Sequence, residues 1–484
     1  MTAQKWFSRL AGLLTVVILT RLLTPSDFGL VAIAMSVVPF LYLLADLGFS
    51  AYLIQADHPK QVDYSTAFWY SLCAGIAVAA VLGLTGYPLQ ILLKVDGVVP
   101  IMWALAPAVV FVAAGSVPTA ILRRRLQFNL IARQAMIGGT VGQIAAVVLA
   151  LKGFGVWALI FQTLATQLVA TLMVWISAKW LPSRAFSIQQ FRSMFLYGSN
   201  VVAVELIALG RGWAENAIVA TALGLNGLGY LSVAQRLIQV SQDLTATAIV
   251  PVSTVVFAQV RKDRDRLCSA YERAQSVTYA LLTPVMVFIA VCAPVIVPMI
   301  FGPQWAESVA PAQALAVAGI LTTIASLDHG LLYGLGRPGT WLVYAMAIDA
   351  LTVTMTFFTA PWGLGAVAVG FIVVALFATV ARWPLVAHQL QTSWQRLAAQ
   401  FGQAVILAIA VSMGGVVAYR ASDGYTDVVT LLSTGSAISL GWLFAAHLLF
   451  PSAIGEGKRL ARRIFEKIRN RAARAQESST LGDR

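Results

Sequence analysis

The sequence predicts an all-α integral membrane protein with about fourteen transmembrane helices. Hydrophobic residues make up 59% of the 484 residues and charged residues only 11%, with a mean hydropathy of +0.80. Soluble domains carry about 25% charged residues, so this composition excludes an ordinary soluble fold. The apolar residues also form long runs, and about 20 such residues are needed for one helix to cross a bilayer. No sizeable soluble domain fits beside these runs.

The apolar runs follow one another along the whole chain. The first follows Lys5 and Arg9, as in a signal peptide, but no small-residue cleavage site follows it and another run begins almost at once. We therefore expect a retained first helix. The expected helices cover residues 7–22, 28–54, 66–87, 99–121, 130–151, 154–178, 194–220, 227–257, 275–301, 309–335, 340–360, 364–388, 398–419 and 425–449.

The net charge of +13 is unevenly distributed among the connections between these helices. Alternate connections are rich in arginine and lysine, as at 123–133, 179–192 and 261–273. The opposite connections hold little beyond Arg21, Lys94, Lys152 and Arg420. Because basic connections stay in the cytoplasm, this pattern predicts that both termini are cytoplasmic. The charge therefore reports topology, and we expect no nucleic-acid partner.

An internal repeat divides the chain. Asp27–Ala34 opens the second expected helix and Gly227–Ala234 the eighth, while Gly153–Leu159 opens the sixth and Gly363–Val369 the twelfth. The two pairs occur in the same order at nearly the same separation, which favours a duplicated half of six helices. Halves with an even number of helices are parallel repeats, related by an axis along the membrane normal.

The repeat predicts four parts of the chain. Residues 1–192 and 193–396 form two six-helix lobes in parallel pseudo-symmetry, and 397–450 holds two extra helices. Residues 451–484 carry cations around an apolar seam with a spacing of four, which is typical of a basic amphipathic helix on the inner leaflet. That tail is either a topology anchor or a docking site for cytoplasmic glycosyltransferases.

Specific motifs connect the chain to a known family. The run Leu22–Ala32, continued by Leu44–Ser50 and Leu53–Gln55, is similar to the amino-terminal signature of Wzx-type polysaccharide flippases. These belong to the multidrug/oligosaccharidyl-lipid/polysaccharide exporter superfamily. Leu228–Tyr230 with Ala234–Leu237 resembles the eighth-helix pattern of that family. The usual pattern has a longer amino terminus, so we expect the cytoplasmic end of the first helix to be curtailed.

The resemblance implies a function. A flippase of this family moves an undecaprenyl-pyrophosphate-linked oligosaccharide from the cytoplasmic to the periplasmic leaflet of the bacterial inner membrane, by alternating access between its two lobes. It serves exopolysaccharide, capsule or O-antigen assembly beside a polysaccharide polymerase and glycosyltransferases. Such a substrate exposes polar groups that are costly in hydrocarbon, so a hydrated route with cationic and hydrogen-bonding walls is required.

Candidate substrate residues lie in the expected helices around the repeat boundary. Arg211 and Glu215 are four residues apart and share one helix face, where they either bracket a ligand or form an ion pair that locks two helices. Arg236, Gln239 and Asp243 form a polar stripe on one face of the next helix, which favours a cavity wall. Arginine suits that wall because its fork binds phosphate or carboxylate in two places.

Three further residues carry charge in or beside apolar spans. Arg21 is expected either to extend to the membrane interface or to contact the substrate cavity. Asp46 is a candidate for coupling to a proton or a sodium ion, with a lobe contact or a hydrogen bond to a loop as the alternatives. Asp328 is the second candidate for ion coupling, beside His329.

Several chemistries find no support in the sequence. No G-x-x-x-x-G-K-[ST] phosphate loop occurs, and the four histidines are scattered. We therefore expect no cofactor, no metal site and no enzymatic activity. Two alternative functions stay open. A cation-coupled small-molecule antiporter of the same superfamily predicts an acidic cavity, and a membrane polysaccharide polymerase predicts a large periplasmic loop.

Overall fold

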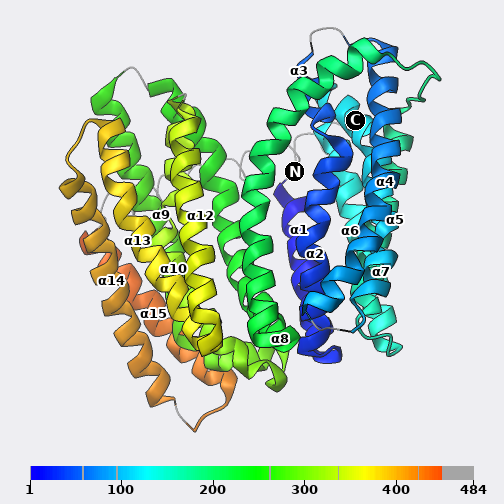
Figure 1. Ribbon diagram of the computed structural model, residues 1–484. Coiled ribbons are helices and arrows are strands. Elements are labelled where there is room, and N and C mark those ends of the chain that lie inside the picture. Colours follow the sequence, from blue (N-terminus) through cyan, green and yellow to red (C-terminus); the bar gives the residue numbers. More distant parts are fainter. Residues whose placement is uncertain are drawn as a thin grey trace, which may run out of the picture. The chain divides into compact units, whose positions relative to one another are not determined.

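The computed structural model describes residues 2–56, 59–93, 96–260, 263–335, 337–422 and 424–449. Every regular element in these ranges is a helix, which confirms the all-α prediction (Figure 1). Two are short 3₁₀ helices, η1 Pro303–Ser308 and η2 Ala360–Trp362. The α-helices are α1 Thr2–Leu22, α2 Pro25–Asp46, α3 Phe49–Gln55, α4 Gln61–Leu93, α5 Val98–Arg124, α6 Phe128–Leu151, α7 Trp157–Ala178, α8 Ile188–Val260, α9 Arg264–Phe301, α10 Val309–Thr322, α11 Ala325–Gly334, α12 Pro338–Thr359, α13 Leu364–Leu390, α14 Trp394–Ala421 and α15 Asp427–Leu449.

Twelve helical stretches of the described chain are long and apolar enough to cross a membrane, so the predicted count of fourteen is not confirmed. Two features account for the difference. Of α1, whose side chains the structure describes from residue 11 onward, the stretch Ala11–Leu22 is too short to count as a span by itself. The two helices expected at 194–220 and 227–257 both run within α8, whose two segments meet at Gly224 with φ 69° and ψ −174°.

The long helix expected over 28–54 is wrong as a single helix. α2 ends at Asp46, and the next two residues, Leu47 and Gly48, have φ angles of 46° and 71°. The chain then continues as the short helix α3. Gly198 of α8 packs against this turn, where an added Cβ would overlap the Leu47 carbonyl oxygen. Asp46 therefore lies at a helix end and not within a helix.

Local chemistry explains where α2 begins. The Thr24 hydroxyl accepts a hydrogen bond from the Asp27 backbone N–H at 3.3 Å, and the Asp27 carboxylate accepts one from the Thr24 N–H at 2.9 Å. This capping box satisfies two backbone donors that no turn of the helix can reach. Pro25 occupies the first helical turn, where the absent N–H costs nothing.

The helices group into two compact units, each assembled from separate segments. Unit 1 comprises Met1–Val240, Val297–Ala312 and Ala345–Val374. Unit 2 comprises Ser241–Ile296, Gln313–Tyr344 and Ala375–Arg484. The lobes expected from the repeat, with their boundary after residue 192, stay a prediction. The predicted basic tail, residues 451–484, lies outside the described residues.

Within unit 1, the two segments paired by the predicted repeat contact each other reciprocally. A Cβ added to Gly29 of α2 would lie 2.0 Å from the Leu225 carbonyl oxygen, and one added to Gly229 of α8 would lie 2.0 Å from the Pro25 carbonyl oxygen. Only glycine allows so close an approach of two helix starts. Equivalent positions of the repeat thus make equivalent contacts.

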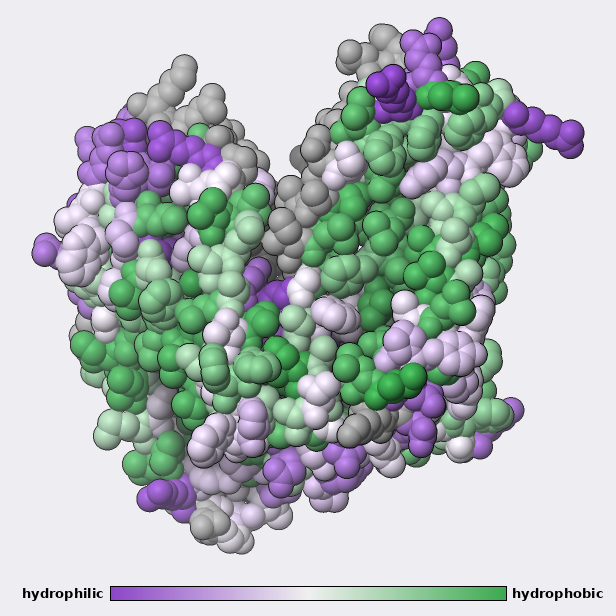
Figure 2. All heavy atoms as spheres, in the orientation of Figure 1, coloured by the Kyte–Doolittle hydropathy of each residue, from purple (hydrophilic) through white to green (hydrophobic). Residues whose placement is uncertain are grey.

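Apolar side chains cover the outer faces of the helices. Figure 2 shows hydrophobic residues over the middle of the helices and hydrophilic residues near their ends. Many large apolar side chains are exposed, among them Leu172, Phe358 and Leu440. Exposed apolar surface on this scale is unfavourable in water and is what lipid requires.

Candidate functional site

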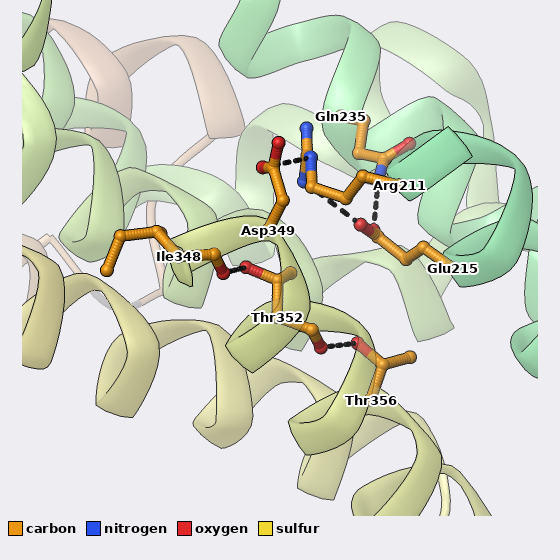
Figure 3. A network of polar contacts seen from close by, with 7 residues as sticks. All are labelled: Arg211, Glu215, Gln235, Ile348, Asp349, Thr352 and Thr356. Atoms are coloured by element: carbon orange, nitrogen blue, oxygen red, sulfur yellow. Dashed lines mark hydrogen bonds and ion pairs between the residues drawn. The ribbon is translucent and has the colours of Figure 1, made fainter. Parts of the chain in front are cut away.

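A network of four polar side chains lies inside unit 1 (Figure 3). Arg211, on the first segment of α8, forms ion pairs with Glu215 at 3.2 Å and with Asp349 of α12 at 3.0 Å. Gln235, on the second segment of α8, donates a hydrogen bond to Glu215 at 3.1 Å. The break at Gly224 separates the two segments of α8 that carry these residues.

The network combines a structural contact with an accessible cation. The Glu215 side chain is only 5% exposed, whereas that of Arg211 is 42% exposed and that of Asp349 is 32% exposed. An arginine has five N–H donors. Nε is directed at Asp349 and Nη1 at Glu215, which leaves donors on the exposed side of the guanidinium. The ion pairs hold α8 and α12 together and leave part of the guanidinium exposed.

The neighbouring threonines of α12 are satisfied within their own helix. Thr352 donates to the Ile348 carbonyl at 2.8 Å, and Thr356 donates to the Thr352 carbonyl at 2.9 Å (Figure 3). Both side chains are buried. The contact between this part of α12 and the network is thus the ion pair of Asp349 with Arg211.

The predicted stripe on the second segment of α8 is only partly described. Arg236 and Gln239 are exposed, and the side chain of Asp243 lies outside the described residues. Within the described ranges, Arg236 makes no ion pair, and the adjacent Gln235 is the residue that contacts Glu215. The role of Arg236, Gln239 and Asp243 in the substrate cavity stays a prediction.

The hydrogen bonds of Arg21 to the described residues go to backbone carbonyl groups. Its Nη2 donates to the Met299 carbonyl at 2.6 Å, near the end of α9. The buried Trp305 of η1 donates to the Thr20 carbonyl at 2.8 Å. Together these bonds fasten the end of α1 to the segment at 297–312, and the predicted substrate contact of Arg21 stays a prediction.

Asp46 lines a polar cavity of about 340 Å³ inside unit 1. Ser50 donates a hydrogen bond to its carboxylate at 2.6 Å. Gln134, only 7% exposed, lines the same cavity, and its Oε1 has no hydrogen-bond partner in the described chain. The remaining polar lining comes from Ser116, Thr119, Arg123, Gln167 and Thr171.

The three arginines of the basic cluster at 123–125 make different contacts. Arg124 donates to the Ala56 and Leu53 carbonyls at the end of α3, and Arg125 donates to the Ala178 carbonyl at 2.9 Å at the end of α7. Both thus satisfy carbonyl groups at helix ends. Arg123 instead lines the cavity that holds Asp46.

Asp328 lies in a closed charge cluster of unit 2. Its carboxylate forms an ion pair with Arg382 Nε at 2.8 Å and accepts a hydrogen bond from the Tyr271 hydroxyl. Asp328 is 0% exposed and the Arg382 side chain 4%. The sequence-based search missed Arg382, although an arginine within the apolar span at 364–388 was itself a signal.

In the described chain, twelve apolar helical stretches with charged networks among them define a polytopic membrane protein. Residues 18–310 match the family described as "Polysaccharide biosynthesis protein", and the chain belongs to that family. This confirms the resemblance to polysaccharide flippases found in the sequence motifs.

Two curated relatives agree with this assignment. The chain is 28% identical to the succinoglycan biosynthesis transport protein ExoT of Rhizobium meliloti (strain 1021), over 70% of this chain and 69% of that protein. It is 22% identical to the lipopolysaccharide biosynthesis protein WzxC of Escherichia coli (strain K12), over 67% of each chain.

Two solved structures share the fold. The lipid II flippase MurJ, in an inward closed conformation, is similar with a TM-score of 0.77 and 14% identity, over 94% of this chain and 99% of MurJ. An inward-facing multidrug resistance transporter of the MATE family is similar with a TM-score of 0.63 and 18% identity, over 80% of this chain and 96% of that chain. These likenesses show the fold of the chain. By their names the relatives are transporters and flippases, in agreement with the prediction that the chain is not an enzyme.

Proposed function

We propose that this protein transfers an undecaprenyl-pyrophosphate-linked oligosaccharide from the cytoplasmic to the periplasmic leaflet of the bacterial inner membrane. Membership of the polysaccharide biosynthesis family supports this proposal, as do the names of the relatives. The transfer serves exopolysaccharide, capsule or O-antigen assembly. Both termini face the cytoplasm, where glycosyltransferases supply the substrate, and a polymerase consumes it on the opposite side.

The observation that carries the proposal is a half-exposed arginine inside apolar helices. Arg211 has two carboxylate partners, of which Asp349 is the more exposed. A pyrophosphate oxygen meets the same guanidinium fork as a carboxylate does. Substrate arrival therefore exchanges Asp349 for phosphate, while Glu215 and Gln235 keep the arginine in place. The exchange releases Asp349, whose side chain is 32% exposed, so that this carboxylate has to be hydrated or protonated once the phosphate has taken its place.

Asp46 is the group that we assign to ion coupling. It lines a cavity that a small cation can enter, and the Gln134 Oε1 offers a second oxygen there. Asp328 is a weaker candidate because its carboxylate is fully buried against Arg382 and Tyr271. A proton or sodium ion would have to break that ion pair before it could bind.

A flux assay in proteoliposomes tests the function. The wild-type protein should transfer a fluorescent lipid-linked oligosaccharide between leaflets. Arg211→Gln should reduce this flux at least tenfold, while Arg192→Gln, which alters an exposed arginine near the start of the same helix, should leave it unchanged. Equal fluxes in both variants would remove Arg211 from the site. Arg211→Lys keeps the charge without the fork and should give an intermediate rate.

The same vesicles test the alternatives. The fold shared with a multidrug transporter, together with the two carboxylates of the network, favours a cation-coupled antiporter as the second candidate. Transport of a cationic dye without lipid transfer would establish that candidate. Formation of glycan polymer in the vesicles would instead establish a polymerase and overturn the flippase proposal.

A further inference from the structure

A second polar cavity lies in unit 2, where the ends of three helices meet. It has a volume of about 660 Å³, within the range of about 300–1,000 Å³ that small-molecule sites occupy. Arg264 comes from the start of α9, and Arg337 follows the end of α11. The remaining lining residues are Leu335, Ala387, His388, Gln389, Gln391 and Thr392.

One buried glutamine orients both arginines of this cavity. Arg264 Nη1 donates to the Gln389 backbone carbonyl at 2.6 Å, and Arg337 Nη1 donates to the Gln389 side-chain Oε1 at 2.8 Å. Gln389 is only 7% exposed, whereas both arginines are exposed. Each guanidinium uses one of its five N–H donors in these bonds, so most of its donors stay available to a ligand.

The charge of the lining selects the chemistry of that ligand. Two arginines line the cavity, and none of its described lining residues is a carboxylate. Neither arginine makes an ion pair within the described ranges. Two guanidinium forks on one cavity match the oxygens of a phosphate group, which they bind by charge-assisted hydrogen bonds. Amide and hydroxyl groups of Gln391 and Thr392 suit the polar remainder of a headgroup.

The position of the cavity indicates where the phosphate comes from. The span that carries Gln389 ends at Leu390, and Trp394 begins the next helix with 51% of its surface exposed. Exposed tryptophan is enriched at the level of lipid headgroups. The helix ends that meet here are those that the charge pattern predicts to face the cytoplasm. A headgroup of the inner leaflet therefore lies within reach.

We propose that the cavity between Arg264 and Arg337 binds the phosphate of an anionic lipid headgroup. A purely structural role explains Arg264 alone, because that side chain satisfies a carbonyl at the end of α13. It does not explain Arg337, which contacts a side chain and extends along the same cavity. The site is separate from Arg211, so its test is independent of the flippase assay.

Native mass spectrometry of the purified full chain in neutral detergent tests the proposal. Phosphatidylglycerol should bind with a measurable affinity, and phosphatidylcholine should bind more weakly. Arg264→Gln/Arg337→Gln should weaken phosphatidylglycerol binding at least tenfold, which corresponds to about 1.4 kcal/mol. Arg273→Gln provides the matched control, because Arg273 is exposed on α9 and bonds only to its own helix.

Two outcomes would overturn the proposal. One is an equal affinity in the double variant and the wild type, and the other is an equal loss in the Arg273→Gln control. Arg337→Gln alone leaves the carbonyl bond of Arg264 intact, so it remains informative if the double variant does not fold. Inorganic pyrophosphate distinguishes a lipid phosphate from a free one. If pyrophosphate displaces bound phosphatidylglycerol, both bind at the two arginines, which supports the proposal. If pyrophosphate binds and no lipid does, the ligand is not a lipid and the proposal is refuted.

Discussion

Replacing Gly29 with alanine tests the close contact between the two repeat segments. The added Cβ would lie 2.0 Å from the Leu225 carbonyl oxygen, whereas ordinary van der Waals contact begins at 3.4 Å. The difference, 3.4 − 2.0 = 1.4 Å, is the distance by which the two helix starts must separate. Overpacking of this kind costs about 1–3 kcal/mol. Alanine in a helix recovers about 0.5–1 kcal/mol, so the net loss should lie between about 0 and 2.5 kcal/mol.

A matched control separates the steric effect from helix propensity. Gly139 of α6 has no atom within 4 Å of an added Cβ, so Gly139→Ala should stabilise the protein by about 0.5–1 kcal/mol. Unfolding of the purified protein in SDS titrations from mixed micelles measures both changes. A stabilising Gly29→Ala substitution would show that the two helix starts do not pack as described.

The reciprocal glycine makes a sharper test. Gly229→Ala should cost about as much as Gly29→Ala, because its Cβ meets the Pro25 carbonyl oxygen at the same distance. Once one alanine has separated the helix starts, the second meets a wider gap. The double variant should therefore lose at least about 0.5 kcal/mol less than the sum of the single losses. Full additivity would contradict a shared contact.

Three further predictions concern charges and a buried indole. Arg382→Met leaves Asp328 buried without its partner and should destabilise the protein by about 3–5 kcal/mol in SDS titrations, whereas Asp328→Leu/Arg382→Met should recover most of that loss. Asp46→Asn should abolish the dependence of flux on an imposed sodium or proton gradient, and Asp427→Asn, at the start of α15, should not; retained dependence in Asp46→Asn would exclude that residue. Trp305→Phe removes one hydrogen bond to a backbone carbonyl of α1 and should lower stability by about 0.5–1.5 kcal/mol, and a loss above this range would indicate that the indole has a larger packing role.

Local signals in the sequence were sufficient for the helices. Apolar runs of the required length predicted their positions, and the Thr24–Asp27 motif marked the start of α2. The pairing of Arg211 with Glu215 was equally local, because residues four apart on a helix face each other. The break after Asp46 was missed, although Gly48 follows this polar residue closely and glycine is a common signal for the end of a helix.

Contacts between distant segments set the limit of the sequence-based prediction. Asp349 and Arg382 each pair with a residue on another helix, and no spacing rule connects such positions. Gln235 shows a second limit of the sequence-based prediction, which is the choice between two adjacent polar residues of one helix. Adjacent residues on a helix point about 100° apart, since one turn holds 3.6 residues. The neighbouring Arg236 was predicted as a site residue because of its charge, although Gln235 is the residue that contacts Glu215 in the network.

The pairing of charges singles out Asp46. Four carboxylates of the candidate sites have described side chains, namely Asp46, Glu215, Asp328 and Asp349. Three of them form ion pairs with arginine, as intramembrane charges require. Asp46 forms no ion pair in the described chain. It accepts a hydrogen bond from Ser50 and lines a cavity together with Arg123 and the unpartnered amide oxygen of Gln134. An exchangeable ion can neutralise a carboxylate more easily where no arginine is paired with it, so the proposal of ion coupling favours Asp46 among these four carboxylates.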